Sequence, residues 1–232
     1  MRKNIGVILA GGKGKRFGTV PPKQFAFIGD KMIIEYTIEN LKRAKKVDEI
    51  YITINPKYKE LGYKLAEKYK HITKIIEGGR TRTESIYNSS LEVNEEVKKV
   101  VFIDAVRPFV PPHVFDEFMR LLDKYGVVKF CSKIVDYLAF TGDSEFIERT
   151  DNRDKWRLCK APVGYQSEIL KRISKIPREE VLKFESDLGL VLSKVPNTEI
   201  YAYESSEFNF KITYKEDLQL AKLLLKHHPR NT

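Results

Sequence analysis

Short apolar runs alternate with stretches of helical periodicity along residues 1–130. The expected strands lie at 4–10, 49–54, 72–76, 100–103 and 127–132, and the expected helices between them at 32–44, 56–69, 83–91 and 113–125. Strands that alternate with helices form βαβ units, with a mainly parallel sheet and right-handed crossovers. The sequence therefore predicts a three-layer, Rossmann-like α/β fold, in which ligands bind beyond the carboxyl ends of the strands.

Residues 133–160 interrupt this alternation. Alternating runs flank Thr-Gly-Asp at 141–143, which predicts a β-hairpin that projects as an arm. Such an arm often serves in oligomerisation, although an ordinary surface hairpin fits the sequence equally well. Further helices are expected near 166–174 and 184–193, a strand at 199–203 and a last helix from Lys215. Because no repeat or linker divides the chain, we expect a single domain over 1–232.

Composition narrows the classes of function. The chain is 42% hydrophobic, but no apolar run approaches the roughly 20 residues of a membrane span, and the N-terminal run ends in glycines, so we expect a cytoplasmic protein. The net charge of +10 comes largely from lysines that alternate with acids on expected helix faces, which is typical of a solvated surface. We therefore expect neither a nucleic-acid nor a membrane partner. Cys131 and Cys159 suit reduced, buried thiols, and the four histidines form no ligand pattern.

A loop rich in glycine and cations follows the first expected strand. It reads LAGGKGKRFG at 9–18 and continues as PPKQ at 21–24. It is not the dinucleotide fingerprint, because Phe17 occupies the third glycine position, and not a P-loop, because Arg16 follows Gly14-Lys15. Glycines allow backbone N–H groups to approach an anion closely. We expect a triphosphate cradle rather than a flexible loop that binds nothing, formed by Ala10, Gly11, Gly12, Gly14 and Lys15 with Lys13, Arg16 and Lys23.

Five blocks, in order, carry a resemblance to a known family. They are the loop with its PKQ continuation, GGRTRTESI at 78–86, DAVRPF at 104–109, Val135-Asp136, and NFKIT followed by EDL at 209–218. Together they resemble the cytidylyltransferases that act on 2-C-methyl-D-erythritol 4-phosphate and D-ribitol 5-phosphate. The resemblance implies a glycosyltransferase-A-like nucleotidyltransferase fold. It also implies transfer of CMP from CTP to a polyol or sugar phosphate, with release of pyrophosphate.

The implied reaction joins two anions, so its catalysts should be fixed cations and a metal rather than a protein nucleophile. The expected catalytic residues are Arg16, Lys23 and Lys211, the last of them at the end of a strand-like run. Asp104 follows a strand end and is expected to hold Mg²⁺, although an aspartate there could instead cap a turn. Lys211 could likewise be an ordinary surface lysine.

The other expected roles concern the base and the acceptor. Gly79 and Ser85 are expected to line a cytosine pocket that Arg82 braces, and the nucleotide site also includes Arg80 and Ala105; Ser85 alone would suit a helix cap. Arg107 is a candidate for the acceptor phosphate or for an internal salt bridge. In the family the arm crosses to a second subunit, which implies a homodimer in which Asp136 and Arg153 serve the partner's site.

Departures from the family pattern lie on the acceptor side. Ile103 replaces a histidine, Tyr137 a threonine, and Ala161 with Val163 stands where the family has T-P-Q. The residues expected to bind the nucleotide therefore match the family pattern, whereas those expected near the acceptor depart from it. Three alternatives stay open: a different phosphorylated acceptor, another nucleoside triphosphate, or a relative that binds nucleotide without turnover.

Overall fold

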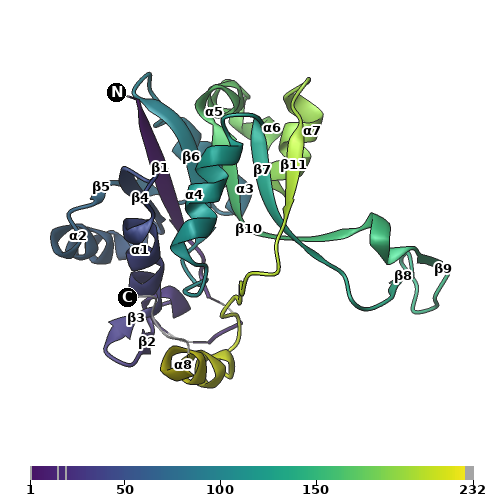
Figure 1. Cartoon of the computed structure of the whole chain (residues 1–232), viewed down its shortest axis with the longest axis horizontal. Helices are drawn as coiled ribbons and strands as arrows, with labels where there is room; N and C mark the ends of the chain where they lie inside the picture. The colour runs from purple at the N-terminus through teal and green to yellow at the C-terminus, as the bar shows by residue number, and fades with distance from the viewer. Residues whose placement is uncertain (1, 15, 19, 228–232) are drawn as a thin grey trace.

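A seven-stranded sheet forms the centre of the computed structural model, which describes residues 2–14, 16–18 and 20–227 (Figure 1). Its order is β11-β7-β10-β6-β1-β4-β5. Six strands run parallel to one another, and β10 runs antiparallel to both neighbours. The strands are β1 (Lys3–Ala10), β4 (Glu49–Ile54), β5 (Ile72–Glu77), β6 (Val97–Asp104), β7 (Val127–Lys133), β10 (Arg157–Gln166) and β11 (Ile200–Glu204). The predicted α/β class with a mainly parallel sheet is confirmed.

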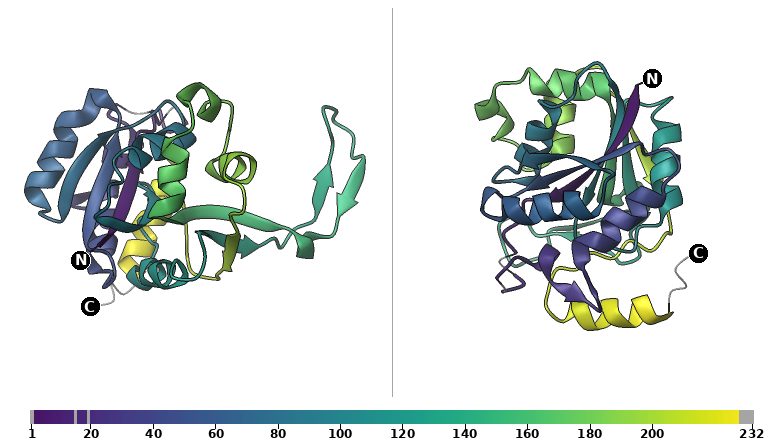
Figure 2. Two further views of the ribbon diagram at one scale, coloured as in Figure 1. Left: turned by 90° about the horizontal axis from the view of Figure 1, so that it is seen from above. Right: turned by 90° about the vertical axis from the view of Figure 1, so that its left-hand side faces the viewer.

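Helices cover both faces of the sheet and make three layers (Figure 2). One face carries α1 (Ile33–Arg43), α2 (Lys59–Lys68) and α4 (Pro112–Leu121), and the other carries α3 (Arg82–Ser90), α5 (Ser167–Ser174), α6 (Arg178–Val181) and α7 (Asp187–Lys194). Side chains of β6 alternate between the two cores. Val101 and Ile103 pack under α1 and α4, whereas Val100 and Phe102 pack under α3 and α5. None of the described helices combines the length and apolar character that a bilayer span requires.

A third apolar cluster joins the end of the chain to its beginning. It contains Phe17, Ile28, Ile33, Ile212 and Ala221. Phe17 belongs to the glycine loop, Ile212 to the segment before the last helix, and Ala221 to that helix. The short elements here are η1 (Lys23–Phe25), β2 (Phe27–Ile28), β3 (Lys31–Met32) and α8 (Asp217–His227), with η2 (Pro56–Tyr58) before α2. This packing brings the segment that contains Lys211 next to the glycine loop.

The predicted hairpin is confirmed and projects from the body as an arm (Figures 1 and 2). It pairs β8 (Leu138–Phe140) with β9 (Arg149–Asp151) in antiparallel register, and η3 (Arg153–Lys155) leads back to β10. Gly142 takes a φ of 56° in the connecting loop, a left-handed conformation that glycine adopts without strain. The arm therefore leaves the sheet at the carboxyl end of β7 and returns along β10.

Three sequence expectations were wrong in detail. The sequence expectations include no strand at Arg157–Gln166, where the structure has β10; Pro162 lies where the pairing register between Cys159 and Val163 is irregular. The run expected to be strand-like and to end at Lys211 forms no strand, since residues 205–213 have no regular secondary structure. The helix expected at 184–193 begins at Asp187, because the Ser186 side chain caps it by accepting a hydrogen bond from Gly189 N at 3.0 Å.

Candidate active site

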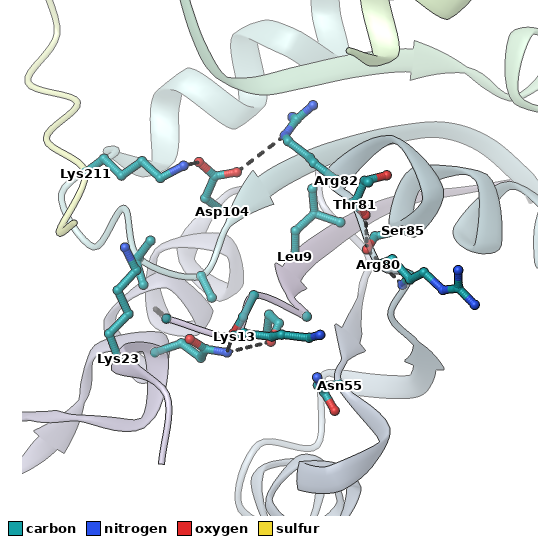
Figure 3. A pocket seen from close by; sticks show the side chains of 18 of the residues that line it. Leu9, Lys13, Lys23, Asn55, Arg80, Thr81, Arg82, Ser85, Asp104 and Lys211 are labelled. Atoms are coloured by element: carbon teal, nitrogen blue, oxygen red, sulfur yellow. Dashed lines mark hydrogen bonds and ion pairs between the residues drawn. The ribbon is translucent and has the colours of Figure 1, made fainter. Parts of the chain in front are cut away.

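A pocket of about 310 Å³ opens at the carboxyl ends of β1 and β6 (Figure 3). Its described lining carries six cationic side chains, those of Lys13, Arg16, Lys23, Arg80, Arg82 and Lys211, against the single carboxylate of Asp104. The other described residues of the predicted nucleotide site also line this pocket: Ala10, Gly11, Gly12, Gly14, Gly79, Ser85 and Ala105. Lys15 lies outside the described residues. A pocket with this excess of positive charge suits a polyanion such as a triphosphate.

Gln24 holds the glycine loop in shape. Its buried side-chain amide donates to the carbonyl oxygens of Ala10 at 2.7 Å and Gly12 at 2.9 Å. Gly14 follows with a φ of 64° and accepts a hydrogen bond from Phe17 N at 2.9 Å. The two hydrogen bonds of Gln24 join the loop to η1, and residues 10–14 of the loop line the pocket. This role of Gln24 is not among the sequence expectations, although the PKQ block contains the residue.

Arg16 and Lys23 line the pocket on the side of the C-terminal segment. The Arg16 guanidinium lies 5.8 Å from the centre of the Tyr214 ring, and Lys23 Nζ lies 3.4 Å from the carbonyl oxygen of Thr213. Partial burial and the nearby positive charges of Lys211 and Arg16 lower the pKa of Lys23 to about 8. Lys23 is thus an ammonium that gains stability when an anion enters the pocket.

Asp104 ends β6 and lies among three cations, of which Lys211 and Arg82 are drawn beside it in Figure 3. Its Oδ2 is 3.0 Å from Lys211 Nζ and 3.0 Å from Arg107 Nε, and its Oδ1 is 3.5 Å from Arg82 Nε. Burial alone would raise the pKa of this carboxyl, but the charges of Arg82, Lys211 and Arg107 outweigh burial and hold the pKa well below its usual range. Asp104 is therefore ionised at neutral pH.

Arg107 is not among the residues that line the pocket. It is buried, pairs with Asp104, and donates from Nη1 to Asn209 O at 3.1 Å and to Asn209 Oδ1 at 2.8 Å. Asn209 in turn donates from Nδ2 to the carbonyl oxygen of Ala161 at 2.6 Å. Of the two alternatives for Arg107, the structure shows the internal salt bridge. This network fixes Asp104 and the segment that carries Lys211.

The other wall of the pocket is the turn before α3. Ser85 Oγ accepts a hydrogen bond from Gly79 N at 3.0 Å and donates to Thr81 O at 2.9 Å. Thr81, not Ser85, caps α3, because Thr81 Oγ1 accepts from Glu84 N at 3.1 Å. A Cβ on Gly79 would lie 2.5 Å from the Cβ of Glu84, so this position requires glycine.

Arg82 joins this wall to the rest of the site through ion pairs with Asp104 and Asp187. Its Nη1 pairs with Asp187 at the start of α7, and Asp187 Oδ2 accepts a hydrogen bond from Tyr165 OH at 2.7 Å. No partner within the described part of the chain faces the buried Nη2 of Arg82. Arg80 is more exposed, and its backbone N donates to Glu84 Oε2 at 2.5 Å.

Asp136 and Arg153 lie on the arm and do not line the pocket of their own chain. Asp136 is exposed. Arg153 donates to the carbonyl oxygen of Val135, and its guanidinium lies 5.3 Å from the centre of the Tyr137 ring. Within one chain, the structure thus separates the expected acceptor residues of the arm from the nucleotide residues.

Comparison with known proteins agrees with this geometry. The family model of IspD, 2-C-methyl-D-erythritol 4-phosphate cytidylyltransferase, matches residues 5–227. A protein of that name from Clostridium botulinum is 31% identical over 97% of this chain and 99% of its own length. The bifunctional ribulose 5-phosphate reductase/CDP-ribitol pyrophosphorylase Bcs1 of Haemophilus influenzae is 30% identical over 97% of this chain, which spans 48% of that longer protein.

A solved structure shares the fold. The 4-diphosphocytidyl-2C-methyl-D-erythritol synthase of Anaerococcus prevotii superposes with a TM-score of 0.81, covering 97% of this chain and 99% of the other, at 23% identity. The glycine loop, Asp104 at the end of β6, and Lys211 beside it thus belong to a fold that the comparisons identify independently. The chain is a member of the 2-C-methyl-D-erythritol 4-phosphate cytidylyltransferase family.

Proposed function

We propose that the protein transfers CMP from CTP to the phosphate of a small polyol or sugar phosphate and releases pyrophosphate. The observation that carries this proposal is the pocket in which Arg16, Lys23 and Lys211 surround a space bordered by the glycine loop and Asp104. Fixed cations on several sides of one anionic ligand stabilise charge that redistributes during transfer at phosphorus. The family to which the chain belongs supports CTP as the nucleotide.

In the proposed reaction an oxygen of the acceptor phosphate attacks the α-phosphorus of CTP. The new bond joins that oxygen to the α-phosphorus, the bond from the α-phosphorus to the bridging oxygen breaks, and pyrophosphate leaves. Arg16 and Lys23, beside the glycine loop, would stabilise the charge on the leaving phosphates. Lys211, which pairs with Asp104 at 3.0 Å, would hold the attacking phosphate close to the α-phosphorus.

Asp104 fits Mg²⁺ as the metal's protein ligand. Mg²⁺ at nucleotide sites takes one or two carboxylates and completes its octahedron with phosphate oxygens and water. In the described chain no group of three or more His, Cys, Asp or Glu is arranged to hold a metal, so most ligands would come from the triphosphate. When bound, Mg²⁺ would neutralise phosphate charge. Asp104 suits this role because it is ionised and lines the pocket.

Cytosine would bind between the glycine loop and the turn before α3. Gly79 and Ser85 line the pocket there, together with Gly11 of the glycine loop. A carbonyl oxygen there can accept from the amino group of cytosine, whereas uracil offers a second carbonyl in its place. This arrangement supports CTP over UTP.

The burial of the residues that depart from the family pattern bears on acceptor specificity. Ile103 and Val163 are fully buried and Ala161 nearly so, and none lines the pocket. Tyr137 is 85% exposed on the arm. Of these four departures from the family pattern, only Tyr137 is therefore placed to contact a ligand directly. The relatives are named for methylerythritol and ribitol phosphates, and these are the first acceptors to test.

We also propose a homodimer formed through the arm, in which Asp136 and Arg153 complete the partner's site. Large apolar side chains are exposed on the arm, including Val135, Tyr137, Phe146 and Ile147. Such a concentration of exposed apolar surface is typical of an interaction site. Mixing Lys23→Ala with Arg153→Ala protein should restore about a quarter of wild-type turnover, because half of the random dimers would carry one intact site of two. No recovery after mixing would argue against shared sites.

We place the enzyme in the cytoplasm, where its proposed substrates, CTP and small phosphorylated polyols, would be available. Cell fractionation followed by immunoblotting tests this location. Recovery of the protein in an extracytoplasmic fraction would contradict it.

The function is tested by pyrophosphate release with CTP and Mg²⁺ over a panel of polyol and sugar phosphates. Turnover should occur on one acceptor and fall strongly in Lys23→Ala. Lys64→Ala, which alters an exposed lysine on α2 away from the pocket, should behave as wild type. CTP binding without turnover on any acceptor would favour a nucleotide-binding relative, and a preference for another nucleotide would contradict the assignment of cytosine.

A further inference from the structure

The two cysteines of the chain face each other at the base of the arm. Cys131 of β7 is paired with Cys159 of β10 in the antiparallel ladder, and their Sγ atoms are 3.6 Å apart. Cys131 is buried, whereas Cys159 is exposed. The expectation that both cysteines are buried thiols is therefore wrong for Cys159, and their spacing in the chain gives no sign of this contact.

The strand pairing suits a covalent bond between the two sulfur atoms. Residues directly opposite each other in an antiparallel pair have Cα atoms about 4.5–5.5 Å apart, and disulfides span about 4.4–6.8 Å. The register is irregular between Cys159 and Val163, so β10 is not held to its neighbour by an unbroken ladder just after Cys159. A small adjustment of the side chains and of this part of the strand brings the sulfur atoms together.

We propose that Cys131 and Cys159 form a reversible dithiol–disulfide site that adjusts the active site through Asn209. The proposed co-reactant is a low-molecular-weight disulfide. In the first step the Cys159 thiolate attacks one sulfur of this reagent, forming a mixed disulfide and releasing one thiolate. In the second step the Cys131 sulfur attacks Cys159 Sγ and displaces the second thiolate. The two protons lost by the cysteines end on the two released thiols, so the protein is oxidised by two electrons and the reagent is reduced by two.

The difference in exposure sets the order of these steps. Burial and the hydrogen bond with Cys159 raise the pKa of Cys131 to about 12, so little Cys131 thiolate exists at neutral pH. Cys159 is the thiol that solvent and a small disulfide can reach. Cys159 therefore acts as the attacking thiol, and Cys131 as the resolving one.

A short series of contacts leads from this pair to the pocket. Ala161, two residues after Cys159, accepts the hydrogen bond from Asn209 Nδ2 at 2.6 Å. Asn209 Oδ1 accepts from Arg107 Nη1 at 2.8 Å, and Arg107 Nε donates to Asp104 Oδ2 at 3.0 Å. Lys211 follows Asn209 by two residues and pairs with the same carboxylate. Movement of β10 at Cys159 is therefore expected to shift the segment that positions Lys211 and Asp104.

The chemical part of the proposal is tested without substrates. Reduced full-length protein is incubated with oxidised glutathione and then denatured in the presence of N-ethylmaleimide, which labels the remaining free thiols. The mass of the product is measured by mass spectrometry. Wild type should pass from two maleimide labels to none, without a retained glutathione and without covalent dimers. Cys131→Ala should stop with one glutathione on Cys159, because the resolving thiol is missing. A wild-type protein that also stops at the glutathione adduct, or that keeps two free thiols, would overturn the proposal.

The effect on the active site rests on the proposed function and is measured separately. Oxidation should lower wild-type turnover several-fold, a thiol reductant should restore it, and Cys159→Ser should be insensitive to both. Hydrogen exchange of residues 205–213, compared between the reduced and oxidised forms, reports the same coupling even if no acceptor supports turnover. If the disulfide forms and the exchange of this segment does not change, the link through Asn209 is wrong.

Discussion

Lys23 should take up a proton when CTP binds. In the free protein, burial and the charges of Lys211 and Arg16 lower its pKa to about 8. The triphosphate would bring several negative charges next to the same ammonium, which favours the protonated form. Binding of CTP should therefore raise the pKa of Lys23 toward its ordinary value of about 10.4.

The size of the effect follows from the pKa of the free form. If Lys23 is fully protonated in the complex, each bound CTP takes up about 0.1 proton at pH 7, about 0.5 at pH 8 and about 0.9 at pH 9. The sign is fixed because the complex holds more protons than the free protein. Affinity for CTP should consequently fall as pH rises above about 8, by at most about tenfold per pH unit, until the pKa of Lys23 in the complex is reached.

Isothermal titration calorimetry measures this uptake directly. The binding enthalpy is recorded at each pH in two buffers with different ionisation enthalpies, and the difference gives the number of protons exchanged. Lys23→Met should lose the uptake near pH 8, and Lys64→Met, on the exposed face of α2, should keep it. Proton release by wild type, or equal uptake in Lys23→Met, would refute this view of Lys23.

Three substitutions test other parts of the site. Asp104→Asn leaves Arg107 buried without its carboxylate. Turnover should therefore fall roughly 10²–10³-fold, and the free energy of unfolding measured in urea should fall by about 3 kcal/mol. Near-normal turnover would exclude Asp104 as the proposed metal ligand. Gln24→Leu leaves the carbonyl oxygens of Ala10 and Gly12 without the donor amide. It should lower the free energy of unfolding by about 1–3 kcal/mol and raise the KM for CTP. An unchanged KM would show that the loop keeps its shape without this amide. Gly79→Ala forces a Cβ against Glu84, so CTP binding by calorimetry should weaken sharply and stability fall by about 1–3 kcal/mol; normal affinity would contradict this packing.

The nucleotide side could be predicted from sequence because its signals are local. The run from Ala10 to Lys23 combines a strand end, glycines and cations within a few residues, and its residues 10–14, Arg16 and Lys23 line one pocket with Asp104 and Lys211. The helices and parallel strands up to β7 were predictable for the same reason, since each has its own apolar period.

The remainder depends on contacts between distant parts of the chain. The salt bridge of Arg82 with Asp187 and the hydrogen bond of Asn209 with Ala161 leave no trace in local sequence pattern. Strand β10 contains Pro162, a residue that disfavours a central strand, and only its pairing with β6 and β7 reveals it. Arg107 fitted two roles equally well from sequence, and its burial beside Asp104 distinguishes them.

The most direct test of the account follows the phosphorus atoms of CTP. The protein is incubated with Mg²⁺, an acceptor from the panel, and CTP labelled either at the α- or at the γ-phosphorus. We predict that the α-label appears in a new organic product together with cytidine, and that the γ-label appears only in pyrophosphate. A γ-label in the organic product would show phosphoryl transfer, as by a kinase, and would contradict cytidylyl transfer at this site.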